Sequence, residues 1–325
     1  MIKFSIIIPA YNVEDYIFEC LSSVASQSVS GNIFEIIVID DCSDDNTFNI
    51  ISSYNRVANY SIISNNKNEG LGFSRNTGVK LSKGEYLVFL DADDLLHENA
   101  LKFLSDCIDK YSSDIVVCNW GYYHDIIKNR NNIKRNNFNM IPYGKKQSIE
   151  FCLSLKGVDY TNNHKIMKKS LFGDNKITYS KGFHEDIAVT LKLFYYANKI
   201  DSIDDIFYIQ RVRCDSITST FNEEHILGLF CAWNDMLDFA LLKDKNNNNN
   251  IYKFYLEGVS GIISNMLDKI SALNEDNIKL ALNDSLIDAI VNNKNIDVVE
   301  LRESPVKTKK TIRTNKFLDK YVLKR

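Results

Sequence analysis

Paired cysteines, long apolar runs and a large excess of one charge are all missing from this sequence. Its seven cysteines are scattered without a Cys-x-x-Cys pair, which argues against a disulfide framework or zinc site and favours a reduced, cytoplasmic protein. No run of about 18 apolar residues occurs and the opening lacks a secretory segment, so we expect no membrane span. A net charge of −3 argues against a general nucleic-acid binder, whose surface would be basic.

A glycine-rich nucleotide loop is also absent after the first predicted strand. Residues 9–12 read "PAYN", where a Rossmann dehydrogenase would carry Gly-x-Gly-x-x-Gly. A response-regulator receiver would place its aspartate pair after the first strand, whereas residues 40–41 follow the second predicted strand. Both classes therefore fit poorly.

What the sequence does contain, in its first third, is an alternation of short β-rich runs with helical patterns. The runs occupy residues 3–8, 34–40, 60–64 and 85–91, and a further strand is predicted at 113–123. Such alternation predicts a parallel sheet with crossover helices. Asn12 and Ser43 precede helical patterns whose first turns are acidic, so we predict both residues as helix N-caps.

The pattern changes near residue 220, where helical segments replace the alternation. These segments cover residues 222–242, 251–272 and 276–292. A chain of 325 residues suits one large domain or two moderate ones. We therefore predict an α/β domain over residues 1–220 and an all-α region over residues 221–325.

Polar side chains gather where the predicted strands end. The segments after the first four strands are "PAYN" (9–12), "DDCSDDN" (40–46), "NNKNEGLGFSRN" (65–76) and "DADD" (91–94). Ligands of open α/β sheets bind beyond the carboxyl ends of the strands. One such end alone is more often a turn and a helix cap. Four in succession predict a binding edge.

The carboxylates of Asp91, Asp93 and Asp94 lie within four residues. Like charges repel, so the cluster needs water or a cation. Residues two apart on a strand share a face, which lets Asp91 and Asp93 point the same way. Because Mg²⁺ and Mn²⁺ prefer carboxylate and phosphate oxygens, we predict a divalent metal at Asp93 that binds the diphosphate of a sugar nucleotide. The alternative is a solvated strand end.

Five stretches together resemble the family 2 glycosyltransferases of the GT-A fold. They are residues 5–28, 35–47, 68–94, 177–200 and 208–220. The resemblance implies a mostly parallel mixed sheet with flanking helices over residues 3–220. It also implies an inverting, metal-dependent enzyme that moves a hexosyl or N-acetylhexosaminyl group from a UDP-sugar. The acceptor would be a hydroxyl of a glycan or lipid-linked molecule in cell-surface polysaccharide synthesis.

The resemblance also implies roles for single residues in the donor site. Asp41 would accept a hydrogen bond from uracil, Asp93 would bind Mn²⁺ or Mg²⁺, and Asp94 would support the metal shell. Arg75 would lie beside the nucleotide cleft, with a structural pairing to Asp91 as the alternative. The positions assigned to nucleotide binding are Pro9, Ala10, Tyr11, Asp41, Asn68, Arg75, Asp91 and Ala92.

The catalytic base is assigned by the same resemblance to Asp186, at the start of a predicted helix, with Glu185 as the second candidate. A helix N-terminus keeps such a carboxylate ionised and able to receive a proton. Arg211 and Ser216 belong to a loop that would close over the diphosphate. The family's Trp-Asn-Lys segment is kept only as Lys165, which leaves acceptor recognition open.

Residues 304–325 carry eight basic residues and one acidic residue, Asp319. A basic amphipathic end is suited to the anionic inner face of the membrane. A solvated terminus and partner docking through the helical region, including homo-oligomer formation, are the alternatives. For the whole chain, the alternative to an enzyme is an inactive nucleotide-sugar-binding or scaffold protein on the same fold. The sequence identifies neither the sugar nor the acceptor.

Overall fold

The computed structural model describes residues 2–30, 33–124, 134–135 and 161–212, together with single helical positions between 225 and 242. The predicted boundary near residue 220, the helical region beyond residue 242 and the basic segment 304–325 lie outside the described residues. Within the described part, no helix is long and apolar enough to cross a membrane.

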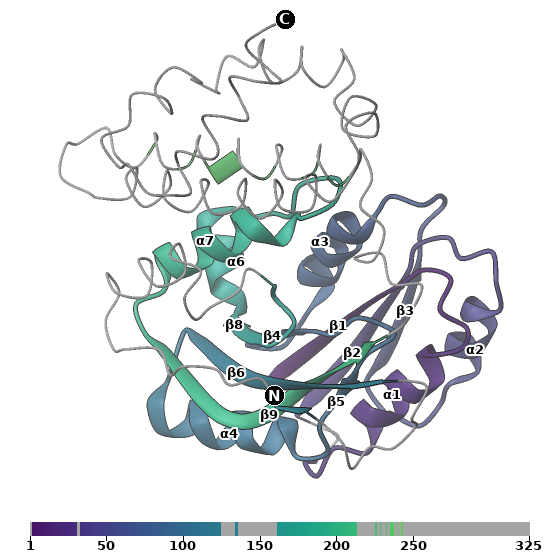
Figure 1. Ribbon diagram of the computed structural model, residues 1–325, viewed down its shortest axis with the longest axis horizontal. Helices are drawn as coiled ribbons and strands as arrows, with labels where there is room; N and C mark the ends of the chain where they lie inside the picture. The colour runs from purple at the N-terminus through teal and green to yellow at the C-terminus, as the bar shows by residue number, and fades with distance from the viewer. Residues whose placement is uncertain are drawn as a thin grey trace, which may run out of the picture.

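A mixed sheet forms the centre of the molecule (Figure 1). Its order is β3-β2-β1-β4-β8-β6-β9-β5, with β7 paired to β6. Strands β3, β2, β1 and β4 are parallel, whereas β8 runs antiparallel to β4 and to β6. The strands are β1 (Phe4–Ala10), β2 (Phe34–Asp40), β3 (Tyr60–Ser64), β4 (Tyr86–Phe89), β5 (Leu95–Leu96), β6 (Ile115–His124), β7 (Lys134–Arg135), β8 (Lys165–Lys168) and β9 (Ile200–Val212).

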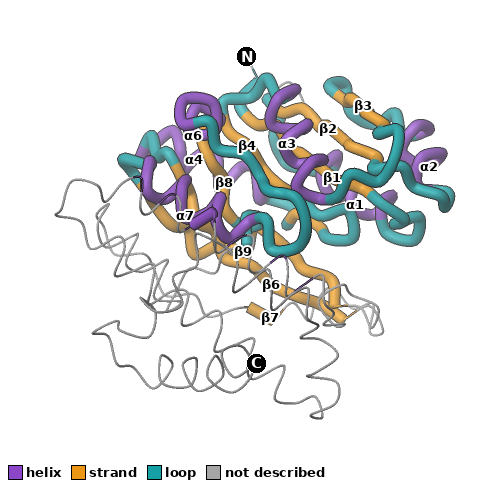
Figure 2. Tube along the Cα trace, turned by 90° about the horizontal axis from the view of Figure 1, so that it is seen from above, coloured by secondary structure: helices purple, strands orange, loops and turns teal. Residues whose placement is uncertain are grey.

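Helices cover both faces of the sheet (Figures 1 and 2). Helices α1 and α4 bury their apolar sides in one core cluster, and α6 and α7 bury theirs in another on the opposite face. The helices are α1 (Ile17–Ala25), α2 (Thr47–Ser53), α3 (Leu71–Leu81), α4 (Ala100–Tyr111), α6 (Lys169–Asn175) and α7 (Asp186–Tyr196). The predicted α/β architecture is confirmed.

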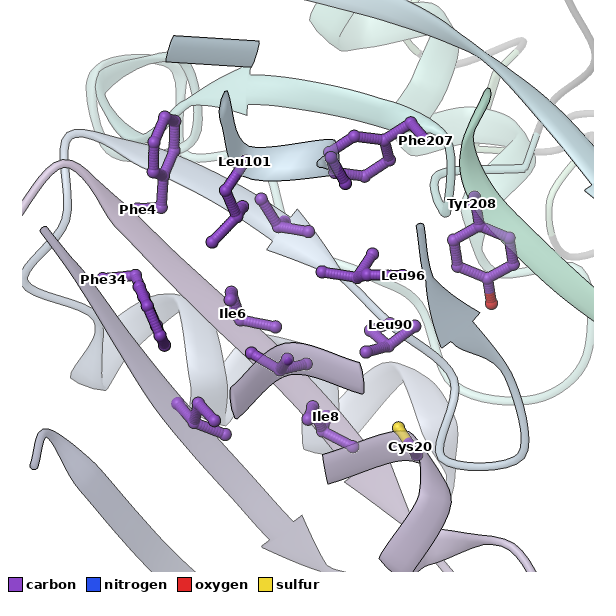
Figure 3. Close-up of a cluster of buried hydrophobic side chains, with 14 of the residues drawn as sticks. Phe4, Ile6, Ile8, Cys20, Phe34, Leu90, Leu96, Leu101, Phe207 and Tyr208 are labelled. Atoms are coloured by element: carbon purple, nitrogen blue, oxygen red, sulfur yellow. The ribbon is translucent and has the colours of Figure 1, made fainter. Parts of the chain in front are cut away.

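Because helices cover both faces of the sheet, β1 and β2 are continuous apolar runs. All seven residues of each strand are buried, as expected of central parallel strands. Alternate side chains of β1 enter opposite cores: Ile6 and Ile8 belong to one cluster and Ile7 to the other. Figure 3 shows the first cluster, where Ile6 and Ile8 lie near Leu90, Leu96 and Cys20.

The two predicted helix caps are wrong. Helix α1 begins only at Ile17 and α2 only at Thr47. Asn12 and Ser43 instead join the loops that precede these helices: the Asn12 N–H donates to Ser43 Oγ (3.1 Å) and the Asn12 side-chain oxygen accepts from the Asp44 N–H (3.0 Å). A side chain that suits a cap also suits a neighbouring loop, and only the packed fold brings the two loops together.

Candidate active site

The carboxyl ends of β1, β2 and β4 meet at one edge of the sheet. Ala10 pairs with Asp40, and the Asp41 N–H continues the ladder by donating to the Ala10 carbonyl (2.8 Å). On the other side of β1, the Leu90 N–H donates to the Ile7 carbonyl (3.0 Å). The main chain therefore brings the segments that follow these strands side by side.

Three predicted nucleotide-binding positions end strand β1 and begin the next loop. Pro9 and Ala10 are buried within the strand, so their side chains lie in the protein interior. Tyr11 is 46 % exposed and presents an aromatic ring at the edge. Of the three, Tyr11 is the residue whose side chain is available to contact a ligand.

Asp41 organises the loop between β3 and α3. Its carboxylate accepts hydrogen bonds from Asn65 Nδ2 (2.6 Å), the Glu69 N–H (2.9 Å) and the Gly70 N–H (2.7 Å). Gly70 has φ +93°, a left-handed conformation that favours glycine. A carboxylate offers about four acceptor positions, and these three donors use most of those of Asp41, whose surface is 4 % exposed. Asn68 lies in the same loop with its side chain exposed.

Asp94 fastens the loop after β4 to strand β9. Its buried carboxylate accepts from the Tyr208 hydroxyl and from the Arg211 N–H (2.7 Å). Burial raises the pKa of Asp94 well above its ordinary value, and the charges of Asp93 and Asp91 add to the rise. Ala92 is buried as well, whereas Asp93 is partly exposed. The loop thus presents Asp93 while anchoring its neighbours.

The Arg211 side chain also links β9 to this loop. Its Nε donates to the Asp93 carbonyl (2.8 Å), its Nη2 pairs with Glu19 of α1 (2.6 Å), and the guanidinium lies over the Tyr16 ring (5.0 Å). These contacts hold the side chain within the protein framework. Diphosphate binding by Arg211 stays a prediction, and Ser216, predicted with it, lies outside the described residues.

Arg75 is the central charge of the site. Its Nη1 pairs closely with Glu185, and its Nη2 contacts Asp91 Oδ1 (3.1 Å) and Asn163 Oδ1 (3.4 Å). Asn163 Nδ2 completes the group by donating to Asp91 Oδ2 (2.6 Å). Burial alone would lower the pKa of Arg75, but Glu185 and Asp91 outweigh it and hold the pKa above its ordinary value. The geometry favours the structural pairing of Arg75 with Asp91.

The segment before α7 is tied to helix α3. Asn76 and Tyr179 exchange two hydrogen bonds, from Asn76 Nδ2 to the Tyr179 carbonyl (2.9 Å) and from the Tyr179 N–H to Asn76 Oδ1 (2.8 Å). The Arg75 guanidinium lies 5.6 Å from the centre of the Tyr179 ring. A Cβ at Gly72 would stand 2.3 Å from the Ser180 carbonyl oxygen, so only glycine permits this approach.

The two acidic residues at the start of α7 have different surroundings. Glu185 is buried against Arg75. Burial raises the pKa of Glu185, and the charge of Arg75 acts against that rise. Asp186, the first residue of the helix, is partly exposed. Asp186 is therefore the more exposed member of the pair, and its role as the base stays a prediction.

The sequence model of the family described as Glycosyl transferase family 2 matches residues 5–175 of this chain. The chain belongs to this family. The matched region includes the edge formed by β1, β2 and β4 and ends before α7. The mixed sheet with helices on both faces is the GT-A fold of the family 2 enzymes.

Two curated relatives are named as enzymes that act on poly(ribitol-phosphate). The poly(ribitol-phosphate) beta-N-acetylglucosaminyltransferase TarS of Staphylococcus aureus is 33% identical over 214 residues, which cover 64% of this chain and 35% of TarS. A poly(ribitol-phosphate) beta-glucosyltransferase of Bacillus spizizenii is 32% identical over 218 residues, covering 66% of this chain and 33% of that protein. The match thus spans about a third of the length of these relatives.

Solved structures of TarS share the fold. The crystal structure of TarS 1–349 superposes with a TM-score of 0.68 at 26% identity, covering 93% of this chain and 82% of that one. TarS 1–349 has also been solved in complex with UDP-GlcNAc, with a TM-score of 0.65 and 24% identity over 90% of this chain and 80% of that one.

The carboxylates after β4 suit a metal that is shared with a ligand. Among the described residues, no three His, Cys, Asp or Glu side chains are grouped to hold a metal by themselves. The oxygens of Asp91 and Asp94 already accept hydrogen bonds from protein groups. Asp91 and Asp93 are both partly exposed, whereas Asp94 is buried. Since Mg²⁺ is often bound by one or two carboxylates plus substrate phosphates, this donor set fits such an ion at Asp93.

Two asparagines of the site were not predicted from the sequence. Asn162 accepts from Thr190 Oγ1 of α7 (2.8 Å) and donates to the Tyr179 hydroxyl (3.0 Å), while Asn163 contacts Asp91. Their one signal was the departure at residues 161–165 from the Trp-Asn-Lys segment of the family 2 enzymes. Lys165, the residue kept from that segment, is buried and donates to the Thr161 carbonyl.

Proposed function

We propose that this chain is a metal-dependent, inverting glycosyltransferase that moves a sugar from a UDP-sugar to a hydroxyl of a glycan or lipid-linked acceptor. One observation carries the proposal: Asp91, from the loop after β4, and Glu185, beside the candidate base, meet on the same guanidinium of Arg75. Because both carboxylates contact one cation, the loop after β4 lies beside the start of α7, which supports a donor and a base at one site.

The donor side is supported by several features of the sheet edge. Tyr11 is exposed there, and Asp41, which we predict to accept a hydrogen bond from uracil, fixes the loop between β3 and α3. The relatives named above transfer N-acetylglucosamine or glucose, and TarS has been solved with UDP-GlcNAc. We therefore propose a UDP-linked hexose or N-acetylhexosamine as the donor.

In the reaction, Asp186 accepts the proton of the acceptor hydroxyl while that oxygen forms a bond to the anomeric carbon. The bond from the anomeric carbon to the diphosphate oxygen breaks, and UDP departs with the electron pair. Attack from the face opposite the diphosphate inverts the anomeric configuration. Mg²⁺ or Mn²⁺ bound at Asp93 would neutralise charge on the leaving diphosphate.

The acceptor class is supported by the relatives and by the composition of residues 304–325. Both relatives are named for poly(ribitol-phosphate), a polymer with many hydroxyls. The eight basic residues of 304–325 suit an anionic membrane surface at which a lipid-linked acceptor would lie. Sedimentation with anionic vesicles at low salt should be weaker for a chain truncated after Glu303 than for the full chain. Equal binding would remove membrane contact from the proposal.

The test of the function is UDP release from UDP-GlcNAc and UDP-glucose with poly(ribitol-phosphate) as the acceptor, measured with Mn²⁺, with Mg²⁺ and with a chelator. We expect release from at least one donor in the presence of metal and none with the chelator. Asp93→Asn, which keeps the side-chain shape, serves as the matched control and should match the chelated wild type. Binding of UDP-sugar without any release would support the inactive binding protein instead.

A further inference from the structure

The Arg75 side chain joins three segments that are distant in the sequence. It comes from α3 and contacts Asp91 after β4, Asn163 before β8 and Glu185 directly before α7. Both members of the Arg75–Glu185 pair are nearly inaccessible, with 3 % and 5 % of their surfaces exposed. Neither side chain is therefore available to contact a sugar or an acceptor directly.

We propose that Arg75 and Glu185 are positioning residues, which hold the base Asp186 at a fixed place relative to the donor carboxylates. The inference rests on the proposed function. Glu185 occupies the N-cap position of α7, and Asp186 follows it as the first helical residue. The Arg75 guanidinium binds Glu185 through one nitrogen and Asp91 through another. It thereby fixes the position of the first turn of α7 relative to the loop after β4.

Stability alone explains this pair poorly. Removing a charged pair from water is costly, and a buried pair gives little net stability compared with apolar residues of similar size. Arg fits the position because its planar guanidinium can donate to two carboxylates at once. Glu185 and Asp91 receive separate nitrogens of the group, Nη1 and Nη2. Such geometry favours a role in fixing relative position.

Charge provides a second connection to Asp186. Arg75 from α3 and Tyr179 from the preceding segment interact electrostatically with Asp186, and Glu185 precedes it in the chain. Glu185→Gln removes one negative charge and leaves the Arg75 cation in place. The remaining positive charge favours the ionised form of Asp186. The acidic limb of the rate profile should then move to lower pH.

Glu185→Gln is the first test variant, because Arg75 keeps Asp91 as a counter-charge and the fold should survive. A misplaced base lowers the rate of transfer without weakening donor binding. We expect kcat to fall roughly 10- to 100-fold, while the donor KM and the Mn²⁺-dependent affinity for UDP stay unchanged. Arg75→Lys keeps the positive charge but cannot bind Glu185 and Asp91 at the same time. We therefore expect a similar loss of kcat, without the same shift in the acidic limb of the pH–rate profile.

The matched control is Lys192→Met on the same helix. Lys192 pairs closely with Asp235, so this variant also removes an ion pair of α7, away from Asp186. We expect it to keep the wild-type kcat and pH profile. Wild-type kcat in Glu185→Gln, or an equal loss in Lys192→Met, would overturn the positioning role.

Hydrogen–deuterium exchange separates this inference from the proposed function. Exchange of the amides in the first turn of α7 should be faster in Glu185→Gln than in the wild type and unchanged in Lys192→Met. If wild-type protein releases no UDP from either donor, the proposed function fails. The positioning of α7 is then decided by exchange alone: faster exchange in Glu185→Gln supports it, and unchanged exchange contradicts it.

Discussion

The two sides of the candidate site are built in different ways. The donor edge is positioned by the main chain, since the β1–β2 register runs to Ala10 and Asp40 and the Asp41 N–H extends it. The start of α7 is positioned by side chains, above all by the ion pair between Arg75 and Glu185. A sheet register withstands single substitutions, whereas one side-chain contact can be removed by one mutation.

This difference separates binding from chemistry. Substitutions at the donor edge should change affinity for the nucleotide or the stability of its loops. Changes near α7 should alter the rate of transfer while donor binding is kept. The following predictions test that division, beginning with the largest expected effect.

Asp186→Asn should abolish transfer and keep donor binding. The amide has nearly the same shape but cannot accept the proton, and loss of a general base typically costs about 10²- to 10⁴-fold in rate. Transfer rates and UDP affinity with Mn²⁺ should be measured on the same preparation. An active variant would show that the base is another group.

Asp93→Ala should remove the metal-dependent part of UDP affinity without unfolding the protein. Its side chain is partly exposed, and the neighbouring anchors at Asp94 and Arg211 are untouched. Titration calorimetry of UDP with and without Mn²⁺ measures the effect, and circular dichroism checks the fold. Metal-dependent affinity equal to that of the wild type would place the ion elsewhere.

Much of the donor side could be predicted from the sequence because its signals are local. Short β-rich runs between helical patterns predicted strands β1 to β4 and β6. Polar residues after the first four of these strands predicted the binding edge. The predicted caps Asn12 and Ser43 failed because their partners lie across the interface of two loops. The contacts of Arg211 could not be predicted from local sequence either, because its partner Glu19 is far away in the sequence.

The catalytic side was less predictable for the same reason. The acidic pair 185–186 could be found by resemblance, but nothing local assigns different surroundings to its two members. That difference arises only when α3 brings Arg75 against Glu185, residues 110 positions apart. Likewise, Asn163 gains its place only when β8 starts beside the loop that carries Asp91.

Asp41→Ala should destabilise the donor edge itself. The three donors from Asn65, Glu69 and Gly70 would lose their acceptor, and an unsatisfied buried polar group costs on the order of 1–3 kcal/mol. Thermal unfolding should show a lower Tm. Asn66→Ala, at an exposed position of the same loop, is the matched control and should keep the wild-type Tm. An unchanged Tm in Asp41→Ala would contradict the role of Asp41 in the loop.

The smallest effect is expected at Asp45, in the loop before α2. Burial alone would raise the pKa of Asp45, but hydrogen bonds from Thr47 and the Glu14 N–H lower it below its usual 3.8. Folding therefore favours the ionised form, so its stabilising contribution is present above about pH 3.8 and is lost as the pH falls through the folded value. Asp45→Asn cannot ionise, and its deficit in unfolding free energy should shrink as the solution is acidified. Urea unfolding of both proteins across this range measures the deficit. A deficit that stayed constant with pH would show that the carboxylate charge does not help to join the two loops.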